Sequence, residues 1–132
     1  MVRILQTSYA VWQSLKFVVL QPQSDAGALR RYLYEHGWHI EDERLVIDDG
    51  RLYELMRAVP GQAGALPDWI YDIGPVNWQR RDPLLGRKID ILMETKGHIL
   101  EGLKKSRKDV HERMEKIESE LRFWRELKWQ LQ

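Results

Sequence analysis

The spacing of hydrophobic residues changes several times along the chain, and each change marks a different predicted element. Apolar residues at mixed helical spacings over residues 2–15 predict a helix with one broad apolar face. The unalternating run from Lys16 to Gln21 predicts a strand that is covered on both of its faces. Asp25 in N-cap position and Gly37 at the far end then delimit a second helix.

Two further strands are predicted over residues 38–47 and 52–59, separated by the turn Asp48-Asp49-Gly50-Arg51. The Asp-Gly step of that turn favours positive φ and therefore a β-hairpin. The order of helix, strand, helix and hairpin predicts an α/β fold, the second half of an open α/β sheet finished by an antiparallel hairpin. Residues 60–83 are rich in proline and glycine, which break regular elements, so we expect an ordered crossing loop there.

Beyond residue 84 the hydrophobic positions follow the four-three spacing of packed helices. They lie at Leu85, Ile89, Leu92, Ile99 and Leu103, and then at Val110, Met114, Ile117, Leu121, Trp124 and Leu131. Lys96 and Lys128 each fill a polar step of this pattern. The short basic run 104–108 between the two helices predicts an antiparallel hairpin. We therefore expect three parts: residues 1–60, a connecting loop over 61–83, and a helical hairpin over 84–132.

Composition narrows the class of protein. The chain of 132 residues has 21 basic and 20 acidic residues, a formal net charge of +1, so any contact with nucleic acid must come from local patches. The absence of cysteine removes disulfides, thiolate nucleophiles and cysteine metal sites. No apolar run is long enough for a membrane span, and the start does not match a signal peptide. We expect a cytoplasmic protein.

Three sets of residues are candidates for a site. Gln21 and Gln23, with Pro22 fixed between them, have side-chain amides suited to the edge of a nucleobase, although a solvated strand end is the simpler interpretation. A basic set could contact phosphates, but helical surfaces carry such residues in any case. Its members are Arg30, Arg31, Arg80, Arg81, Arg87, Lys88 and the run from Lys104 to Lys108.

The third set is aromatic. Trp69, Tyr71 and Trp78 could stack on an unpaired base or could fill the core beneath the loop, which is the more common role. His36 and His39 have the spacing of a metal pair, but the helix-to-strand junction between them and the lack of a third ligand argue against a metal.

These residues, taken together, resemble the C-terminal part of the bacterial S-adenosylmethionine (SAM)-dependent tRNA methyltransferases that modify N1 of the adenine at position twenty-two. The resemblance covers nearly the whole chain. It rests on Phe17 to Gln23, Leu29-Arg30-Arg31-Tyr32-Leu33, Glu35-His36-Gly37-Trp38, Asp48 to Glu54, Ile73-Gly74-Pro75 and Arg81-Asp82-Pro83-Leu84. The family implies a Rossmann-like methyltransferase domain followed by an antiparallel coiled-coil hairpin.

By this resemblance, residues 17–21 are the fifth strand of a methyltransferase sheet and Gln21, Pro22 and Gln23 line the pocket for the target base. The same resemblance implies that the tRNA backbone is contacted by Arg30, Arg31, Arg80, Arg81 and Lys88, and at the helical hairpin by Lys104, Lys105, Arg107 and Lys108. The cofactor implied for the family is S-adenosylmethionine. Adenine N1 attacks its methyl group, a step that depends on alignment and on a flipped base more than on a strong base.

The family's glycine-rich SAM loop would precede Met1, and the segment Gly61-Gln62-Ala63-Gly64 opens no helix, so it cannot replace that loop. We therefore expect this chain alone to be inactive and to bind no SAM. An uncovered edge of the fifth strand predicts self-association through that edge, through the helical hairpin, or through both. Two alternatives stay open: a non-catalytic RNA-binding module and a plain oligomerisation element.

Overall fold

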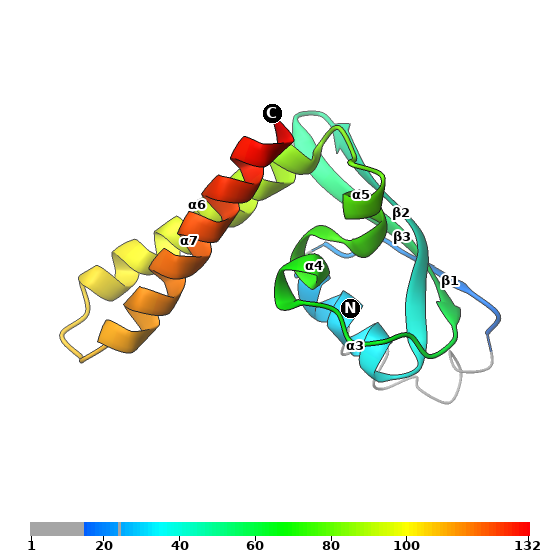
Figure 1. Cartoon of the computed structure of the whole chain (residues 1–132), viewed down its shortest axis with the longest axis horizontal. Helices are drawn as coiled ribbons and strands as arrows, with labels where there is room; N and C mark the ends of the chain where they lie inside the picture. Colours follow the sequence, from blue (N-terminus) through cyan, green and yellow to red (C-terminus); the bar gives the residue numbers. More distant parts are fainter. Residues whose placement is uncertain (1–14, 24) are drawn as a thin grey trace. The chain divides into compact units, whose positions relative to one another are not determined.

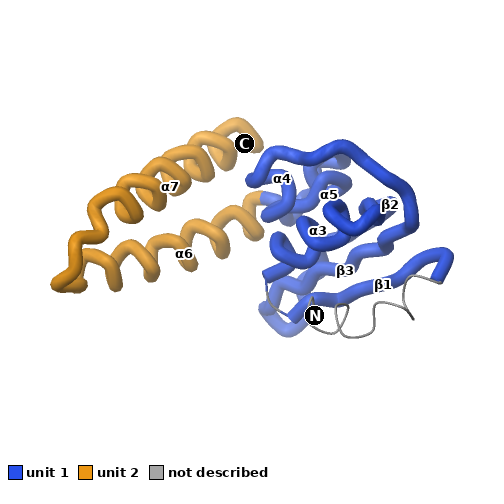
Figure 2. Tube along the Cα trace, turned by 90° about the horizontal axis from the view of Figure 1, so that it is seen from below, with its two compact units in different colours: residues 1–85 blue, residues 86–132 orange. Residues whose placement is uncertain are grey.

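The computed structural model describes residues 15–23 and 25–132. The predicted first helix, over residues 2–15, lies outside this part except for its last residue. The chain divides into two compact units, residues 1–85 and 86–132, which Figure 2 shows in different colours. The first unit combines α-helices with a small antiparallel sheet, and the second is a pair of helices.

A β-hairpin forms most of the sheet of the first unit. Strands β2 (Trp38–Asp48) and β3 (Arg51–Pro60) pair in antiparallel register, from Trp38 opposite Pro60 to Asp48 opposite Arg51. The predicted hairpin is confirmed, with both turn residues at positive φ: 50° at Asp49 and 74° at Gly50. The register shifts between Ile40 and Asp42, which changes the residues that face the core beyond that point.

The first strand of the described chain is short and lies at the edge of the sheet. Strand β1 (Val18–Leu20) pairs antiparallel with β3, so the strand order is β1-β3-β2. Val18 and Leu20 pack against the core, but Val19 is 65% exposed. The prediction of a strand covered on both faces is therefore wrong for the described residues, because only the face that carries Val18 and Leu20 is covered.

Helix α3 (Ala26–Glu35) packs on the covered face of the sheet (Figure 1). The predicted start is confirmed, since the Asp25 carboxylate accepts a hydrogen bond from the Ala28 amide at 3.0 Å. The predicted end is confirmed as well, with Gly37 in a left-handed conformation at φ 79°. The core between helix and sheet includes Leu29, Leu33, Trp38, Ile40, Met56 and Ala58.

Two short helices interrupt the stretch that was predicted to lack regular structure. Helix α4 (Asp68–Ile73) and helix α5 (Pro75–Gln79) are separated by Gly74 alone. The prediction failed because Pro75 stands at the first position of a helix, where its missing N–H costs nothing and its fixed φ is favourable. Gly74, at φ 99°, ends one helix and precedes the other.

The second unit is the predicted pair of antiparallel helices. Helix α6 (Leu85–Lys104), whose first residue belongs to the first unit, is followed after a short turn by α7 (His111–Leu131). Ion pairs join Lys96 to Glu120, at 2.8 Å, and Lys128 to Asp90, which fixes the antiparallel direction. Lys96 and Lys128, the two polar residues within the four-three pattern, thus each bind an acidic residue of the facing helix.

Candidate nucleic-acid interface

The turn after β1 carries the residues predicted to contact a base. At the end of β1, Leu20 pairs with Met56 of β3, which in turn pairs with Glu43 of β2. Gln21 follows Leu20 directly. Gln21 and Gln23 are exposed, whereas Pro22 is buried and anchors the turn. Both amide side chains are therefore accessible to a ligand, and their contact with a base stays a prediction.

The prediction that Arg30 contacts phosphate is wrong. Its side chain is fully buried between α3 and the sheet, where Nε binds Glu43 Oε1 at 3.0 Å and Nη2 binds Glu54 Oε1 at 2.7 Å. Its Nη1 also donates to the carbonyl of Tyr71 at 2.8 Å. All three nitrogens of the guanidinium are engaged inside the protein, so Arg30 is removed from the candidate phosphate contacts.

The charges around Arg30 keep it ionised. Burial by itself lowers the pKa of this guanidinium. The charges and hydrogen bonds of Glu43 and Glu54 together outweigh this effect, so the net pKa lies above its usual range. The buried cluster is therefore one cation between two acids. A cluster of this kind specifies one arrangement of its elements, because each member left unpaired would be a costly buried polar group.

Glu43 extends the cluster to α5. Its second oxygen, Oε2, accepts hydrogen bonds from the amides of Val76, at 2.8 Å, and Asn77, at 3.1 Å. Gly74 lies so close that an added Cβ would meet Glu43 Cδ and Asn77 Nδ2, each at 2.7 Å. The Glu43 carboxylate thus links the sheet to the start of α5, and Gly74 is the residue that allows this approach.

Arg31 lies on the exposed side of α3. Its Nη2 binds Asp68 Oδ1 at 2.8 Å, and its guanidinium carbon lies 4.6 Å from the ring centroid of Tyr71. The hydrogen bond to Asp68 raises the pKa of Arg31 above its usual range. The side chain stays accessible, but a phosphate would have to compete with Asp68.

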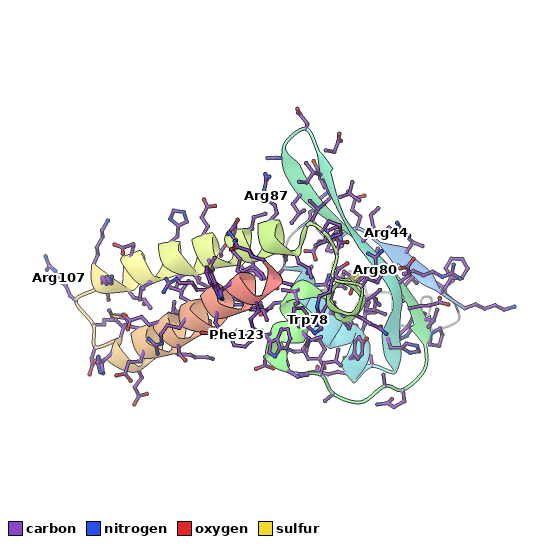
Figure 3. The ribbon with its side chains drawn as sticks, turned by 45° about the horizontal axis from the view of Figure 1, so that its top comes forward. Arg44, Trp78, Arg80, Arg87, Arg107 and Phe123 are labelled. Atoms are coloured by element: carbon purple, nitrogen blue, oxygen red, sulfur yellow. The ribbon has the colours of Figure 1, made fainter. Side chains whose placement is uncertain are left out.

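Arg80 and Arg81 follow α5, and both are exposed next to the half-buried Trp78. Figure 3 labels Arg80 and Trp78. Arg80 Nη2 donates to the Glu43 carbonyl at 3.0 Å and binds Asp82 Oδ2 at 3.1 Å. The guanidinium of Arg81 lies over the ring of Trp78, 3.7 Å from its centroid. The ring of Trp69 meets that of Trp78 edge to face at 5.1 Å.

The three aromatic candidates divide between core and surface. Tyr71 is buried at 4% exposure, and its hydroxyl accepts a hydrogen bond from the Leu66 amide at 3.1 Å, so the role of core filling is confirmed for Tyr71. Trp69 and Trp78 are only half-buried. Stacking on a base therefore stays a prediction for these two residues.

The basic candidates of the second unit lie on α6 and in the turn after it. Lys88 is half-buried near the start of α6. Lys105, Arg107 and Lys108 are exposed in the turn, where Figure 3 shows Arg107, and Lys104 pairs with Glu101 at 3.4 Å. The turn thus presents a cluster of accessible cations.

The two histidines contact backbone carbonyls. His36 Nδ1 lies 2.7 Å from the Tyr32 carbonyl oxygen, and His39 Nδ1 lies 3.0 Å from that of Gly61. Within residues 15–23 and 25–132, no three acidic, histidine or cysteine side chains gather as metal ligands. No helix in this same part of the chain combines the length and apolar character that a membrane crossing requires.

Comparison with known proteins identifies the family. The profile of the family TrmK, tRNA (adenine(22)-N(1))-methyltransferase, matches residues 1–126. The chain belongs to the TrmK family. This confirms the resemblance stated from the sequence. No curated protein sequence matches the chain significantly.

Solved structures show the same fold. A Streptococcus pneumoniae protein described as a tRNA (m1A22) methyltransferase, in complex with S-adenosyl-L-methionine, has a TM-score of 0.77 at 21% identity over 96% of this chain and 53% of its own length. The Bacillus subtilis m1A22 tRNA methyltransferase TrmK has a TM-score of 0.75 at 18% identity, covering 94% of this chain and 56% of its own. The Mycoplasma capricolum TrmK in complex with S-adenosyl-homocysteine has a TM-score of 0.69 at 13% identity, covering 98% and 56%. The chain thus spans about half the length of these relatives and matches part of a Rossmann-like structure.

The residues of this chain do not offer a substitute for a SAM loop at the segment 61–64. The Gly61 amide donates to the Gly37 carbonyl at 2.8 Å, so it is not available to a ligand. A Cβ at Gly61 would meet His39 Cε1 at 2.8 Å, which shows that side-chain atoms already occupy the space beside it. The segment follows a strand and opens no helix, unlike a cofactor cradle.

Proposed function

We propose that this chain carries the substrate side of a SAM-dependent tRNA (adenine-N1)-methyltransferase. The observation that carries the proposal is the match of the TrmK family over residues 1–126, together with a fold that covers about half of the solved relatives. In this proposal the chain acts in the cytoplasm with tRNA as its partner. By itself it neither binds SAM nor transfers a methyl group.

Three residues of the turn after β1 would line the pocket for the target base. Gln21 and Gln23 are exposed and can both donate to and accept from the edge of an adenine, while the buried Pro22 holds the turn. These residues need not act as a strong base, because methyl transfer to a ring nitrogen depends mainly on alignment of the flipped base.

The tRNA backbone would meet the accessible cations of both units. In the first unit these are Arg31, Arg80 and Arg81, and in the second Lys88, Lys104, Lys105, Arg107 and Lys108. Arg30 is left out because it is buried. The exposed turn between α6 and α7 also favours a second candidate function, a non-catalytic RNA-binding module that uses this turn alone.

Filter binding of the full chain to tRNA at several salt concentrations tests the proposal. Replacing Lys104, Lys105, Arg107 and Lys108 by Ala should weaken binding and flatten its salt dependence, by up to about 0.9 in slope for each phosphate that is no longer neutralised. A matched control removes four exposed cations elsewhere: Arg44, Arg51, Arg113 and Lys116. Binding that is indifferent to salt, or equal losses in both variants, would contradict a specific role of the turn.

A second measurement separates the two candidate functions. Replacing Gln21 and Gln23 by Ala should reduce the preference for substrate tRNA over a tRNA without the target adenine, while total affinity changes little. A plain RNA-binding module predicts no change in that preference. Calorimetry should find no SAM binding to the isolated chain, and a micromolar affinity would overturn the proposed division of roles.

We further propose that the chain self-associates, through the edge of β1 that pairs with no other described strand, through the helical hairpin, or through both. Light scattering at micromolar concentration tests this, and a monomeric mass would refute it.

A further inference from the structure

Helix α7 carries a second four-three stripe beside the residues that face α6. The residues that pack or pair toward α6 include Ile117, Trp124 and Leu127, all buried, and the ion-paired Glu120 and Lys128. At about 100° of rotation per residue, a different set follows one line on a flank of the helix, about 110° around from its four-three seam. It consists of His111, Glu115, Glu118, Arg122, Arg125 and Trp129.

The outer stripe of α7, as we call this set, ends in a large uncovered apolar side chain. Trp129 is 76% exposed, the most exposed of the large hydrophobic residues in the described part of the chain. The TrmK match ends at residue 126, three residues before Trp129. The pairing of α7 with α6 uses other residues, and therefore neither the stripe charges nor Trp129 are needed for it.

The charges of the outer stripe are ordered along the helix. The first half has Glu115 and Glu118, and the second half has Arg122 and Arg125. These positions are symmetric about residue 120, so a second α7 laid antiparallel would place each Glu opposite an Arg. The same symmetry places His111 of one copy opposite Trp129 of the other, which allows ring stacking at both ends.

Two other arrangements fit the stripe less well. A parallel second helix would place like charges opposite each other. An RNA or an anionic membrane would be attracted by Arg122 and Arg125 but repelled by Glu115 and Glu118 on the same line.

We infer that the outer stripe of α7 binds the same stripe of a second copy of this chain, antiparallel and with two-fold symmetry. Such an isologous contact needs only one self-complementary surface, and the order of charges supplies it. A single helix face is a small interface, so the dimer is weak and depends on salt. This inference does not depend on the proposed role with tRNA.

Charge reversal in the full chain, followed by sedimentation equilibrium, tests the inference. Replacing Glu115 and Glu118 by Arg makes the stripe wholly basic, and replacing Arg122 and Arg125 by Glu makes it wholly acidic. Each variant alone should dimerise at least about tenfold more weakly than the wild type, because attractive pairs become repulsive ones. An equimolar mixture of the two variants should restore the dimer as a heterodimer.

A matched control makes the same change of net charge on α6. Glu94 and Glu101 are exposed on that helix, and replacing both by Arg should leave dimerisation within about twofold of the wild type at moderate salt. Replacing Trp129 by Ala should weaken the dimer without changing its salt dependence. Circular dichroism of each variant checks that the helices are intact.

Several results would overturn the inference. A wild-type chain that stays monomeric at the highest soluble concentration excludes the contact. Dimers that persist in both reversed variants would place self-association elsewhere, for example at the edge of β1. Failure of the mixture to restore the dimer, or an equal loss in the α6 control, would show a general effect of charge. Loss of tRNA binding in the acidic variant with a monomeric wild type would assign the stripe to RNA instead.

Discussion

Glu43 Oε1 lies 3.0 Å from Nε of Arg30, and neither side chain is exposed to solvent. This pair joins α3 to the sheet, and the other oxygen of Glu43 holds the start of α5. The surface formed by Trp78, Arg80 and Arg81 follows directly along the chain. A buried ion pair in the first unit therefore fixes the segment from which three candidate RNA contacts project.

Replacing Arg30 by Met should destabilise the first unit by about 3–5 kcal/mol, because Glu43 and Glu54 would be left as buried acids without their cation. Urea denaturation followed by tryptophan fluorescence measures this loss. Replacing Arg31 by Met is the control: its pair with Asp68 is exposed, and its loss should cost less than about 1 kcal/mol. Equal losses in the two variants would contradict a special role for the buried cluster.

Replacing Gly74 by Ala should cost about 1–3 kcal/mol or more, because the position has φ 99° and its new Cβ would press on Glu43 and Asn77. Hydrogen exchange should then be faster at the amides of Val76 and Asn77, which donate to Glu43. Gly64 serves as control, since a Cβ there meets nothing within 4 Å. A Gly74 variant as stable as the Gly64 variant would show that Glu43 moves aside freely.

Local signals were sufficient to predict α3, the hairpin and the helix pair from the sequence. Asp25, Gly37 and the Asp49-Gly50 step act within a few residues of their position, and each was found in its predicted role. The four-three pattern of the helix pair even marked Lys96 and Lys128, whose partners lie on the facing helix.

The buried cluster was missed because its members lie far apart in the sequence. Arg30 is 13 residues from Glu43 and 24 from Glu54. The register shift between Ile40 and Asp42 also changes which of the acidic residues Glu41, Asp42 and Glu43 faces inward. A signal was nevertheless present. Glu54 alternates with the core residues Met56 and Ala58 on β3, and Arg30 lies beside Leu29 on the apolar side of α3. An acid and a base on facing apolar surfaces predict a buried pair.

Replacing Ile117 by Asp should unfold the helix pair. If the helices served only as an oligomerisation element, the same change would separate two chains and leave each helical. Ile117 is buried at 5% exposure, and burial of an unpaired carboxylate costs about 4 kcal/mol or more. Far-ultraviolet circular dichroism should show loss of helix, and the thermal transition should broaden or shift downward. Replacing the exposed Ser119 by Asp is the control and should leave the helical signal intact. A helical Ile117 variant would contradict the observed packing.

The stability of the first unit should depend on Tyr34 at alkaline pH. Burial raises the pKa of the Tyr34 hydroxyl, although its hydrogen bond from the Ile40 amide acts in the opposite direction. Because the folded pKa is higher than the unfolded value of about 10, the unfolded chain loses this proton first. The contribution of the protonated hydroxyl is therefore complete below about pH 10 and is lost as the pH rises through the folded pKa.

Replacing Tyr34 by Phe tests this dependence. At neutral pH the variant should be about 1 kcal/mol less stable than the wild type, since the hydroxyl no longer accepts from the Ile40 amide. The difference should shrink in denaturation curves recorded above about pH 10, where ionisation removes the advantage of the wild type. The half-buried Tyr53 on β3, replaced by Phe, provides the control for general alkaline effects. A difference that stays constant over this range would mean that Tyr34 ionises equally well in the folded and unfolded chains.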